Sequence, residues 1–187
     1  PIFRTFYLSL TKYRMGMKSP EFTGFDNFIR LSQSALFWKV IGNTAYWAIL
    51  TVIPSMLVGL VLAMLINRKG KIVGILRVSY FYPAVLPMIA VASIWAFIYM
   101  ARNGLLDQTL MSIGLEPLLA LSKKSTVLPA LAAMYIWKES GYLMVFFLSG
   151  LQSISPEVME AAKIDGSKGF HLFRNITFPL LGPIFLF

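Results

Sequence analysis

The sequence predicts an all-α fold, a polytopic bundle of transmembrane helices. Three observations predict it: 57% of the 187 residues are apolar, only 13% are charged, and three largely apolar stretches are each long enough to cross a bilayer. The charged share is about half that of soluble proteins. Helices are the expected form because an open strand would leave backbone N–H and C=O groups without partners in lipid.

The predicted spans are residues 43–66, 80–101 and 127–151, with the start of another at about 179–187. A helix needs about 20 residues to cross the hydrocarbon core, so the first three ranges suffice. We expect a single transmembrane domain, 1–187, that is truncated at both ends, because residue 1 is not Met and the last range is too short to span. Four prolines within the first three ranges are expected as kinks or first-turn residues: Pro54, Pro83, Pro87 and Pro129.

The formal charge of +9 is expected to reside in loops that set the topology and contact lipid headgroups, not on a nucleic-acid surface. Residues 67–79 hold four basic residues and no acid, which places them in the cytoplasm, and alternation then places 102–126 outside and 152–178 in the cytoplasm. The segment 11–42 would be external although it carries five basic residues, so charge alone does not fix the orientation.

Two absences limit the chemistry of the chain. It has no cysteine, which excludes disulfides and thiolate metal sites. It also lacks the G-x-x-x-x-G-K-[ST] loop that cradles nucleotide phosphates, so it does not bind ATP by that device. No cofactor, metal or catalytic residue is expected.

Residues 152–178 form a polar segment between apolar ranges. Ser155 and Pro156 predict a helix start, because a hydroxyl caps the first turn and Pro fits the first helical position. The Asp-Gly pair at 165–166 predicts its end, since Gly adopts the left-handed conformation that terminates helices. With a second short helix expected at about 168–176, the segment forms a helix–turn–helix elbow with a small, smooth surface at its two central alanines.

This spacing resembles the E-A-A-x-x-D-G signature of ATP-binding-cassette importer permeases, and most of the chain resembles the carbohydrate-uptake permeases of the maltose and glycerol-3-phosphate type. Other similar pieces are "TGFDNFIRL" (23–31), "GILRVSYFYPAVLP" (74–87) and "GLQSISPEVMEAA" (150–162). The residues of the elbow that carry the resemblance are Glu160, Ala161, Ala162, Asp165, Gly166, Phe173, Ile176, Pro179 and Pro183.

The resemblance implies a type I permease fold and a multi-pass protein of the bacterial inner membrane that imports a sugar or a related polyol or sugar phosphate. It implies that the elbow docks in a groove of a separate ATPase subunit, with Ala161 and Ala162 packed closely, Glu160 paired with a basic group, and Gly166 setting the angle between the helices. The implied partners are two ATPase copies, a second permease subunit, an external solute-binding protein and membrane lipid. ATP hydrolysis is expected on the partner, so this chain is not expected to be an enzyme.

Polar and aromatic residues form one-sided stripes in the predicted spans. Lys138 and Glu139 oppose insertion of 127–151 by about 5–7 kcal/mol, against about 3–6 kcal/mol gained from its large apolar residues. Because adjacent helix residues point about 100° apart, the two are not expected to neutralise each other. A sugar path suits such stripes, since aromatic faces stack on sugar C–H groups while hydroxyls hydrogen-bond. The candidate path residues are Thr44, Trp47, Thr51, Ser55, Trp95, Tyr99, Tyr135, Lys138, Glu139 and Tyr142.

Each stripe also has a structural interpretation. Ser and Thr in membrane helices often bond their own backbone or a neighbouring helix, and Trp and Tyr near span ends often act as interface anchors. Two other function classes also fit an apolar bundle: an ion-coupled secondary carrier and a non-transporting membrane anchor protein. A carrier usually needs several intramembrane ionisable groups, of which only Lys138 and Glu139 qualify, and an anchor needs no polar stripe.

Overall fold

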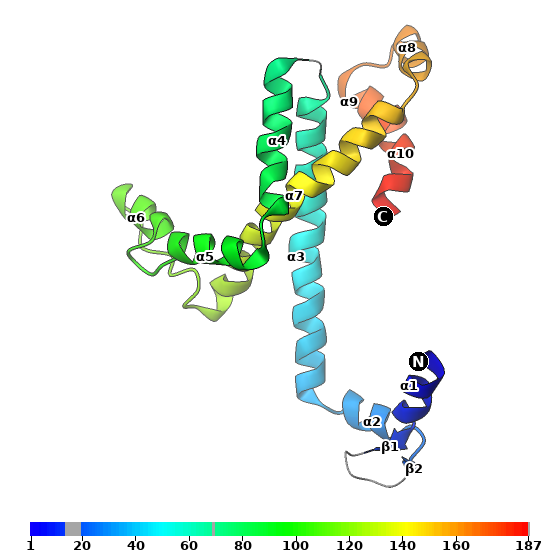
Figure 1. Ribbon diagram of the computed structural model, residues 1–187, viewed down its shortest axis with the longest axis vertical. Helices are drawn as coiled ribbons and strands as arrows, with labels where there is room; N and C mark the ends of the chain where they lie inside the picture. The colour runs from blue at the N-terminus through cyan, green and yellow to red at the C-terminus, as the bar shows by residue number, and fades with distance from the viewer. Residues whose placement is uncertain (14–19, 69, 187) are drawn as a thin grey trace. The chain divides into compact units, whose positions relative to one another are not determined.

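The computed structural model describes residues 1–13, 20–68 and 70–186 of the chain. Its secondary structure is almost entirely helical (Figure 1), and it divides into two compact units, Pro1–Tyr46 and Trp47–Phe187. Four residues used in the charge and span predictions lie outside the described residues: Arg14, Lys18, Lys69 and Phe187.

The first unit contains a small sheet that the sequence did not predict. Asn27 fastens it, because its Nδ2 donates to the carbonyl oxygens of Ser9 and Thr11, both at 2.9 Å. Each strand is only two residues long, too short for an alternating pattern to be visible. The elements of the unit are α1 (Ile2–Ser9), the antiparallel strands β1 (Thr11–Lys12) and β2 (Glu21–Phe22), α2 (Asp26–Ser32), and the first part of α3 (Ala35–Ile66).

Helix α3 contains the predicted span 43–66 and begins before it. Within the described residues it is the one helix that is long and apolar enough to cross a membrane by itself. Pro54 lies inside the helix, as expected of a tolerated proline. The boundary between the two units also falls within α3.

The range 80–101 does not form a single helix. Helix α4 (Lys71–Val85) ends where the chain turns by 98°, and α5 (Met88–Ile98) follows. Pro87 explains the break, because it has no N–H and disfavours the helical conformation of Leu86, which is extended with ψ 138°. The two helices are apolar enough for a span only when they are taken together as one bent pair.

A single carboxylate organises the segment around α6 (Leu105–Ser112). The buried Asp107 accepts backbone hydrogen bonds from Arg102 at 2.8 Å, from Leu118 at 2.9 Å and from Leu119 at 3.3 Å. The Arg102 N–H is the main reason that the pKa of Asp107 lies below its ordinary value; the two other N–H groups and the charge of Lys123 add to it, and burial opposes it. The ionised carboxylate therefore ties the start of this segment to its end.

Asp107→Asn is expected to loosen the segment around α6 and to remove the pH dependence of its stability. The folded pKa lies below the unfolded one, so the stabilisation is complete above about pH 4 and is lost as the pH falls through the folded value. Hydrogen exchange of residues 102–122, corrected for intrinsic rates, should show protection that declines in acid in the native chain and is low at every pH in Asp107→Asn. Equal protection in both proteins would contradict this assignment.

Helix α7 (Lys124–Ser153) is the central helix of the second unit, and it contains the predicted span 127–151. Among the described helices α7 is not apolar enough to count as a span by length and composition, which differs from the prediction for 127–151. Its near-balanced insertion energy is consistent with this difference. Glycines let it approach its neighbours closely: a Cβ on Gly141 would lie 2.0 Å from the carbonyl oxygen of Tyr80 in α4. The main core joins α3, α7 and the C-terminal segment through Leu60, Ala63, Ile66, Met144, Phe147, Leu148 and Leu181.

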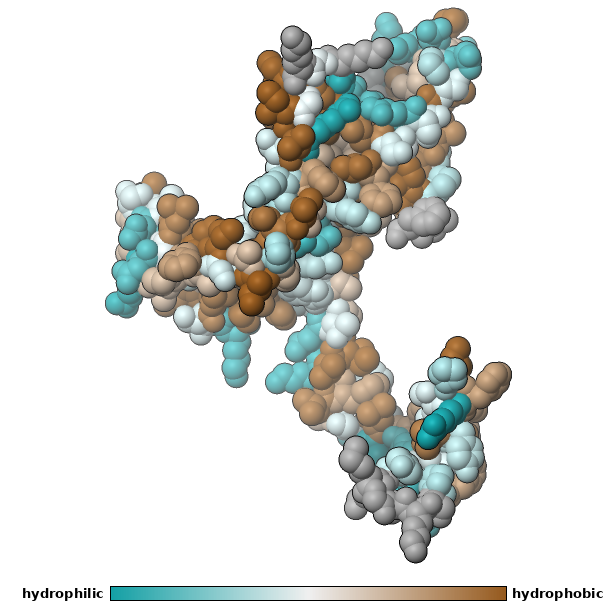
Figure 2. All heavy atoms as spheres, viewed as in Figure 1, coloured by the Kyte–Doolittle hydropathy of each residue, from teal (hydrophilic) through white to brown (hydrophobic). Residues whose placement is uncertain are grey.

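The polar segment starts and stops as the sequence predicts, with α8 over Pro156–Ile164. The predicted single helix at 168–176 is instead a four-residue helix followed by a π-helical turn. The elements after α8 are α9 (Gly169–Leu172), η1 (Phe173–Thr177), α10 (Phe178–Leu180) and η2 (Gly182–Leu186). Apolar side chains cover much of the outer surface of the second unit (Figure 2), which is the surface a lipid or protein neighbour would cover.

Candidate functional site

A cavity of about 570 Å³ lies in the second unit between α3, α7 and η2. Four of the predicted path residues line it: Ser55, Tyr135, Glu139 and Tyr142. Its size falls in the range of about 300–1,000 Å³ that is typical of small-molecule sites. Its apolar lining is Val52, Met56, Leu143, Phe146, Phe147, Ile184 and Phe185.

One polar group of this cavity lacks a hydrogen-bond partner among the described residues. The Oγ of Ser55 is buried and has no partner among the described residues, which leaves a hydroxyl free for water or a ligand. The ring of Tyr135 meets the ring of Trp47 edge to face, with centroids 5.9 Å apart, so the stripes predicted on two separate helices do come together. The cavity thus combines aromatic faces with a hydroxyl and a carboxylate.

Lys138 and Glu139 form an ion pair, with Nζ and Oε1 3.6 Å apart, so the expectation that they would not neutralise each other is wrong. The long lysine stem bends far enough to overcome the difference in direction along the helix. The same Nζ donates to the carbonyl oxygen of Ala84 at 3.0 Å, near the end of α4, where the last carbonyls have no intrahelical partner. Lys138 therefore caps α4 and is not among the residues that line the cavity, whereas Glu139 is.

The remaining path candidates make contacts within the chain, and only the two threonines follow the structural interpretation given above. The hydroxyls of Thr44 and Thr51 donate to carbonyls one turn earlier in α3, at 2.9 and 2.8 Å. Tyr99 is buried and donates to the carbonyl of Ala130 at 2.9 Å. Trp95 packs between Tyr99 and Trp137, with ring centroids 5.1 and 5.8 Å away. These aromatic residues form a second cluster that does not line the cavity.

The phenylalanines of the cavity were not predicted from the sequence. Phe146 lies one turn after Tyr142, and the two rings are 4.7 Å apart. That spacing of four residues was a usable signal, because it places both rings on the same face of α7. Phe185 could not be assigned, since its place against Phe147 at 5.0 Å depends on how η2 folds back onto α7.

Helix α8, the first half of the elbow, is capped at both ends. At its start, the Oγ of Ser155 accepts a hydrogen bond from the N–H of Glu157 at 3.2 Å. At its end, Ser167 N–H donates to the carbonyl of Ala162 and Gly166 N–H to that of Lys163, at 2.9 and 3.1 Å, which is the Schellman arrangement. Gly166 has φ +85° and supplies the left-handed residue that this motif requires.

The two alanines of the elbow have different environments. Ala161 is exposed, whereas Ala162 is only 7% exposed and packs against the rest of the chain. A helix of this length cannot present two adjacent residues equally once one side rests on the rest of the chain. The outer face instead includes Ile164, which is 86% exposed, beside Glu157 and Glu160.

Residues 55–187 match the family described as binding-protein-dependent transport system inner membrane component. The chain is 30% identical over 186 residues to the trehalose/maltose transport system permease protein MalF of Thermococcus litoralis, covering 100% of this chain and 63% of that protein. It is 33% identical over 190 residues to the lactose transport system permease protein LacF of Rhizobium radiobacter, again covering 100% and 63%. The chain thus spans about three-fifths of the length of these relatives.

Two solved structures have a similar fold. One is a bacterial alginate ABC transporter in complex with an alginate pentasaccharide-bound periplasmic protein, with a TM-score of 0.77 and 26% identity over 87% of this chain and 57% of that chain. The other is a bacterial ABC transporter involved in the import of alginate, with a TM-score of 0.79 over 98% of this chain and 62% of that chain. At 23% identity, the second likeness is one of fold alone.

Proposed function

This chain belongs to the family of binding-protein-dependent transport system inner membrane components, and we propose that it is a permease subunit of an ATP-binding-cassette importer. The observation that carries the proposal is the helix–turn–helix elbow, whose first helix is capped at both ends, on a chain whose helix α3 is apolar enough to span a membrane. The proposed cargo is a sugar or a related polyol or sugar phosphate, since the named relatives transport trehalose, maltose and lactose. The proposed location is the bacterial inner membrane, crossed several times.

We infer that α8 transmits ATP-driven motion from a partner. Its exposed face joins the small Ala161 and the apolar Ile164 to two carboxylates, Glu157 and Glu160, and such a face suits a groove with an apolar floor and basic rims. In this proposal Asp165, Gly166 and Pro179 hold the elbow in shape. The proposed partners are two ATPase copies, which hydrolyse the ATP, a second permease subunit and an external solute-binding protein.

The cavity between α3 and α7 is proposed as part of the sugar path. Tyr135 and Tyr142 would stack on the C–H faces of a sugar, while Ser55 and Glu139 would bind its hydroxyls. The ion pair of Lys138 with Glu139 disfavours the carrier hypothesis, because the cation already has two partners within the described residues.

Transport by the complex isolated from its native membrane tests the proposal. In proteoliposomes loaded with ATP, uptake of radiolabelled maltose, lactose or glycerol 3-phosphate is expected only when the external binding protein is present. Uptake that follows an ion gradient without ATP would establish a carrier instead. A preparation with neither an ATPase subunit nor uptake would favour the membrane anchor.

The cavity predicts a specific loss of transport. Tyr135→Leu should lower the maximal uptake rate about tenfold, since an aromatic contact of this kind contributes about 0.5–1.5 kcal/mol and the ring also positions Trp47. The ATPase rate without substrate should not change. The matched control is Phe97→Leu, because that ring is 72% exposed on α5 and is not among the residues that line the cavity. Equal losses in both variants would remove the cavity from the path.

The turn after α8 predicts a pair of variants with opposite outcomes. Gly166→Val should reduce ATP-driven uptake severalfold, because a side chain at φ +85° costs about 1–2 kcal/mol and a branched one costs more. No heavy atom lies within 4 Å of the added Cβ, so crowding would not be the cause. Gly166→Asn should retain uptake, since Asn tolerates the left-handed region. Similar uptake by both variants would show that the conformation of this turn does not matter.

A further inference from the structure

A second cavity, of about 580 Å³, lies where α3 ends and α4 begins. It shares no lining residue with the cavity of the proposed sugar path. The residues that line it are Asn67, Arg68, Gly70, Val73, Gly74, Arg77 and Gln152. Two of the seven are arginines and none is acidic.

Arg77 is held in place with most of its donors unused. One Nη donates to the carbonyl oxygen of Ile66, the last residue of α3, at 3.3 Å. Its Nε is buried and has no hydrogen-bond partner in the part of the chain that the structure describes. A guanidinium carries five N–H donors in a fixed plane, and a buried donor without an acceptor costs free energy. The side chain is therefore oriented and still lacks an acceptor.

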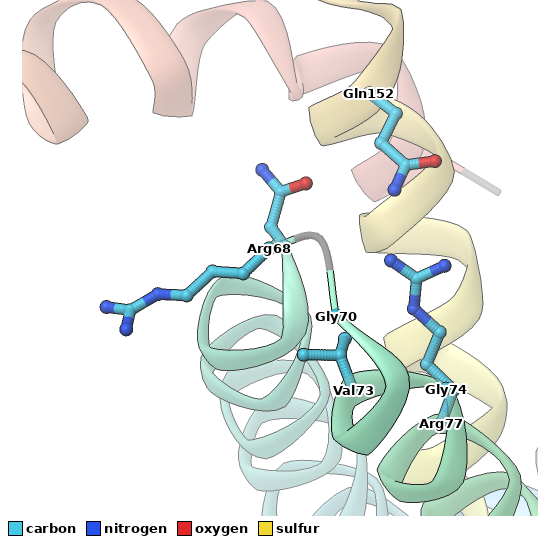
Figure 3. Close-up of a pocket in the computed structure, with 7 residues that line it drawn as sticks. Arg68, Gly70, Val73, Gly74, Arg77 and Gln152 are labelled. Carbon is cyan, nitrogen blue, oxygen red and sulfur yellow. The ribbon is translucent and has the colours of Figure 1, made fainter.

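Other donors face the same cavity. Figure 3 shows the guanidinium of Arg77 and the amide of Gln152 pointing toward each other from α4 and α7. The start of α4 borders the cavity through Gly70, Val73 and Gly74, and its N-cap residue, Gly70, has no side chain to cap the first N–H groups. A helix start is electropositive, so the backbone adds to the charge of the arginine. Arg68 also lines the cavity, although its guanidinium points away from Arg77 and Gln152 in this view.

No carboxylate competes for these donors. The ion pair that the structure shows among its described residues joins Lys138 to Glu139, so neither arginine has an acidic partner within 4.0 Å there. The needed occupant is a compact anion with several oxygen acceptors. A phosphate group meets this need better than a carboxylate, because its oxygens can accept from the guanidinium fork, the amide and the helix start together.

We propose that this cavity binds a phosphate group, carried by a membrane lipid or free in solution. Two features favour a lipid. Helix α3 is long and apolar enough to cross a membrane, and the cavity begins at Asn67, the residue after its end. Next to the cavity, α4 exposes Ile72, Ile75 and Val78 to 73%, 67% and 69%, which is a surface that acyl chains can cover. The phosphate site itself does not depend on the proposed transport function.

Binding to the intact delipidated protein in neutral detergent tests the proposal. Native mass spectrometry should detect retained dioleoyl phosphatidylglycerol but not dioleoylglycerol, which has the same chains without the phosphate. Arg77→Gln should weaken retention about tenfold or more, since charge-assisted contacts to phosphate are among the strongest hydrogen bonds. Arg102→Gln, an equal charge change at an exposed arginine outside the cavity, should leave retention unchanged.

Two further measurements distinguish a lipid phosphate from free phosphate. If inorganic phosphate raises the melting temperature of the native protein but not of Arg77→Gln, and the lipid is not retained, the ligand is free phosphate. Gln152→Ala and Arg68→Gln, both at exposed residues, decide the matter should Arg77→Gln fail to fold; each should weaken retention severalfold. Equal retention of phosphatidylglycerol by every variant, with no effect of inorganic phosphate, would overturn the proposal.

Discussion

Gly141→Ala is expected to destabilise the chain strongly, because Gly141 lies where α7 crosses α4 in close contact. The new Cβ would lie 2.0 Å from the carbonyl oxygen of Tyr80 and 2.9 Å from its carbonyl carbon. These are backbone atoms of α4, so no side chain can rotate away, and the two helices must separate. Overpacking of this kind costs about 1–3 kcal/mol, and more where the backbone has to move.

Thermal unfolding in detergent measures this effect. The melting temperature of Gly141→Ala should fall by at least about 5 °C. Gly42→Ala is the matched control, because it adds the same methyl group inside α3 where nothing lies within 4 Å. Ala is the better helix former by about 1 kcal/mol, so this control should melt at the same temperature or slightly higher. A native-like melting curve for Gly141→Ala would mean that α4 and α7 do not cross there.

Ala161→Trp is expected to abolish ATP-driven uptake while the chain still folds. Ala161 is exposed on α8, so a larger side chain meets solvent in the isolated subunit and the partner in the proposed complex. If α8 docks through this face, the indole holds the surfaces apart and removes a central contact worth about 2 kcal/mol or more, which is about thirtyfold in affinity. Co-purification of the ATPase and ATP-dependent uptake should both be lost.

A tryptophan on the other side of the same helix serves as the control. Lys163 is two residues further along, which places it on nearly the opposite side of α8, and it is also exposed. Lys163→Trp should keep most of the ATPase and most of the uptake. If the two tryptophans are equally harmful, the docking face is not the one that contains Ala161 and Ile164. If neither is harmful, α8 is not the docking element.

The elbow was predictable because its signals act over a few residues. Ser155 caps the turn that immediately follows it, and Gly166 ends the helix that immediately precedes it. Which alanine faces the rest of the chain was not predictable from the same signals. That depends on how α8 is seated, and Ala162 is buried only because the chain covers that side.

The cavity was partly predictable for a related reason. Helical periodicity shows that Tyr135, Glu139 and Tyr142 share a face of α7, but it does not show which helix that face meets. Trp95 and Tyr99 were predicted for the same path but do not line this cavity, and they follow the 98° turn between α4 and α5. Proline marks the position of such a break, whereas its angle depends on contacts that are distant in sequence.

The contact of Lys138 with the end of α4 has a consequence for how the protein is made. The chain emerges from the ribosome in order, so α4 is synthesised well before α7. If α4 is in place when α7 inserts, the carbonyl of Ala84 is there to accept the ammonium group of Lys138. An isolated α7 would carry its cation with only the neighbouring Glu139 to compensate it, whereas the nascent protein presents a ready-made acceptor. The break after α4 thus leaves a carbonyl oxygen that the later helix α7 uses.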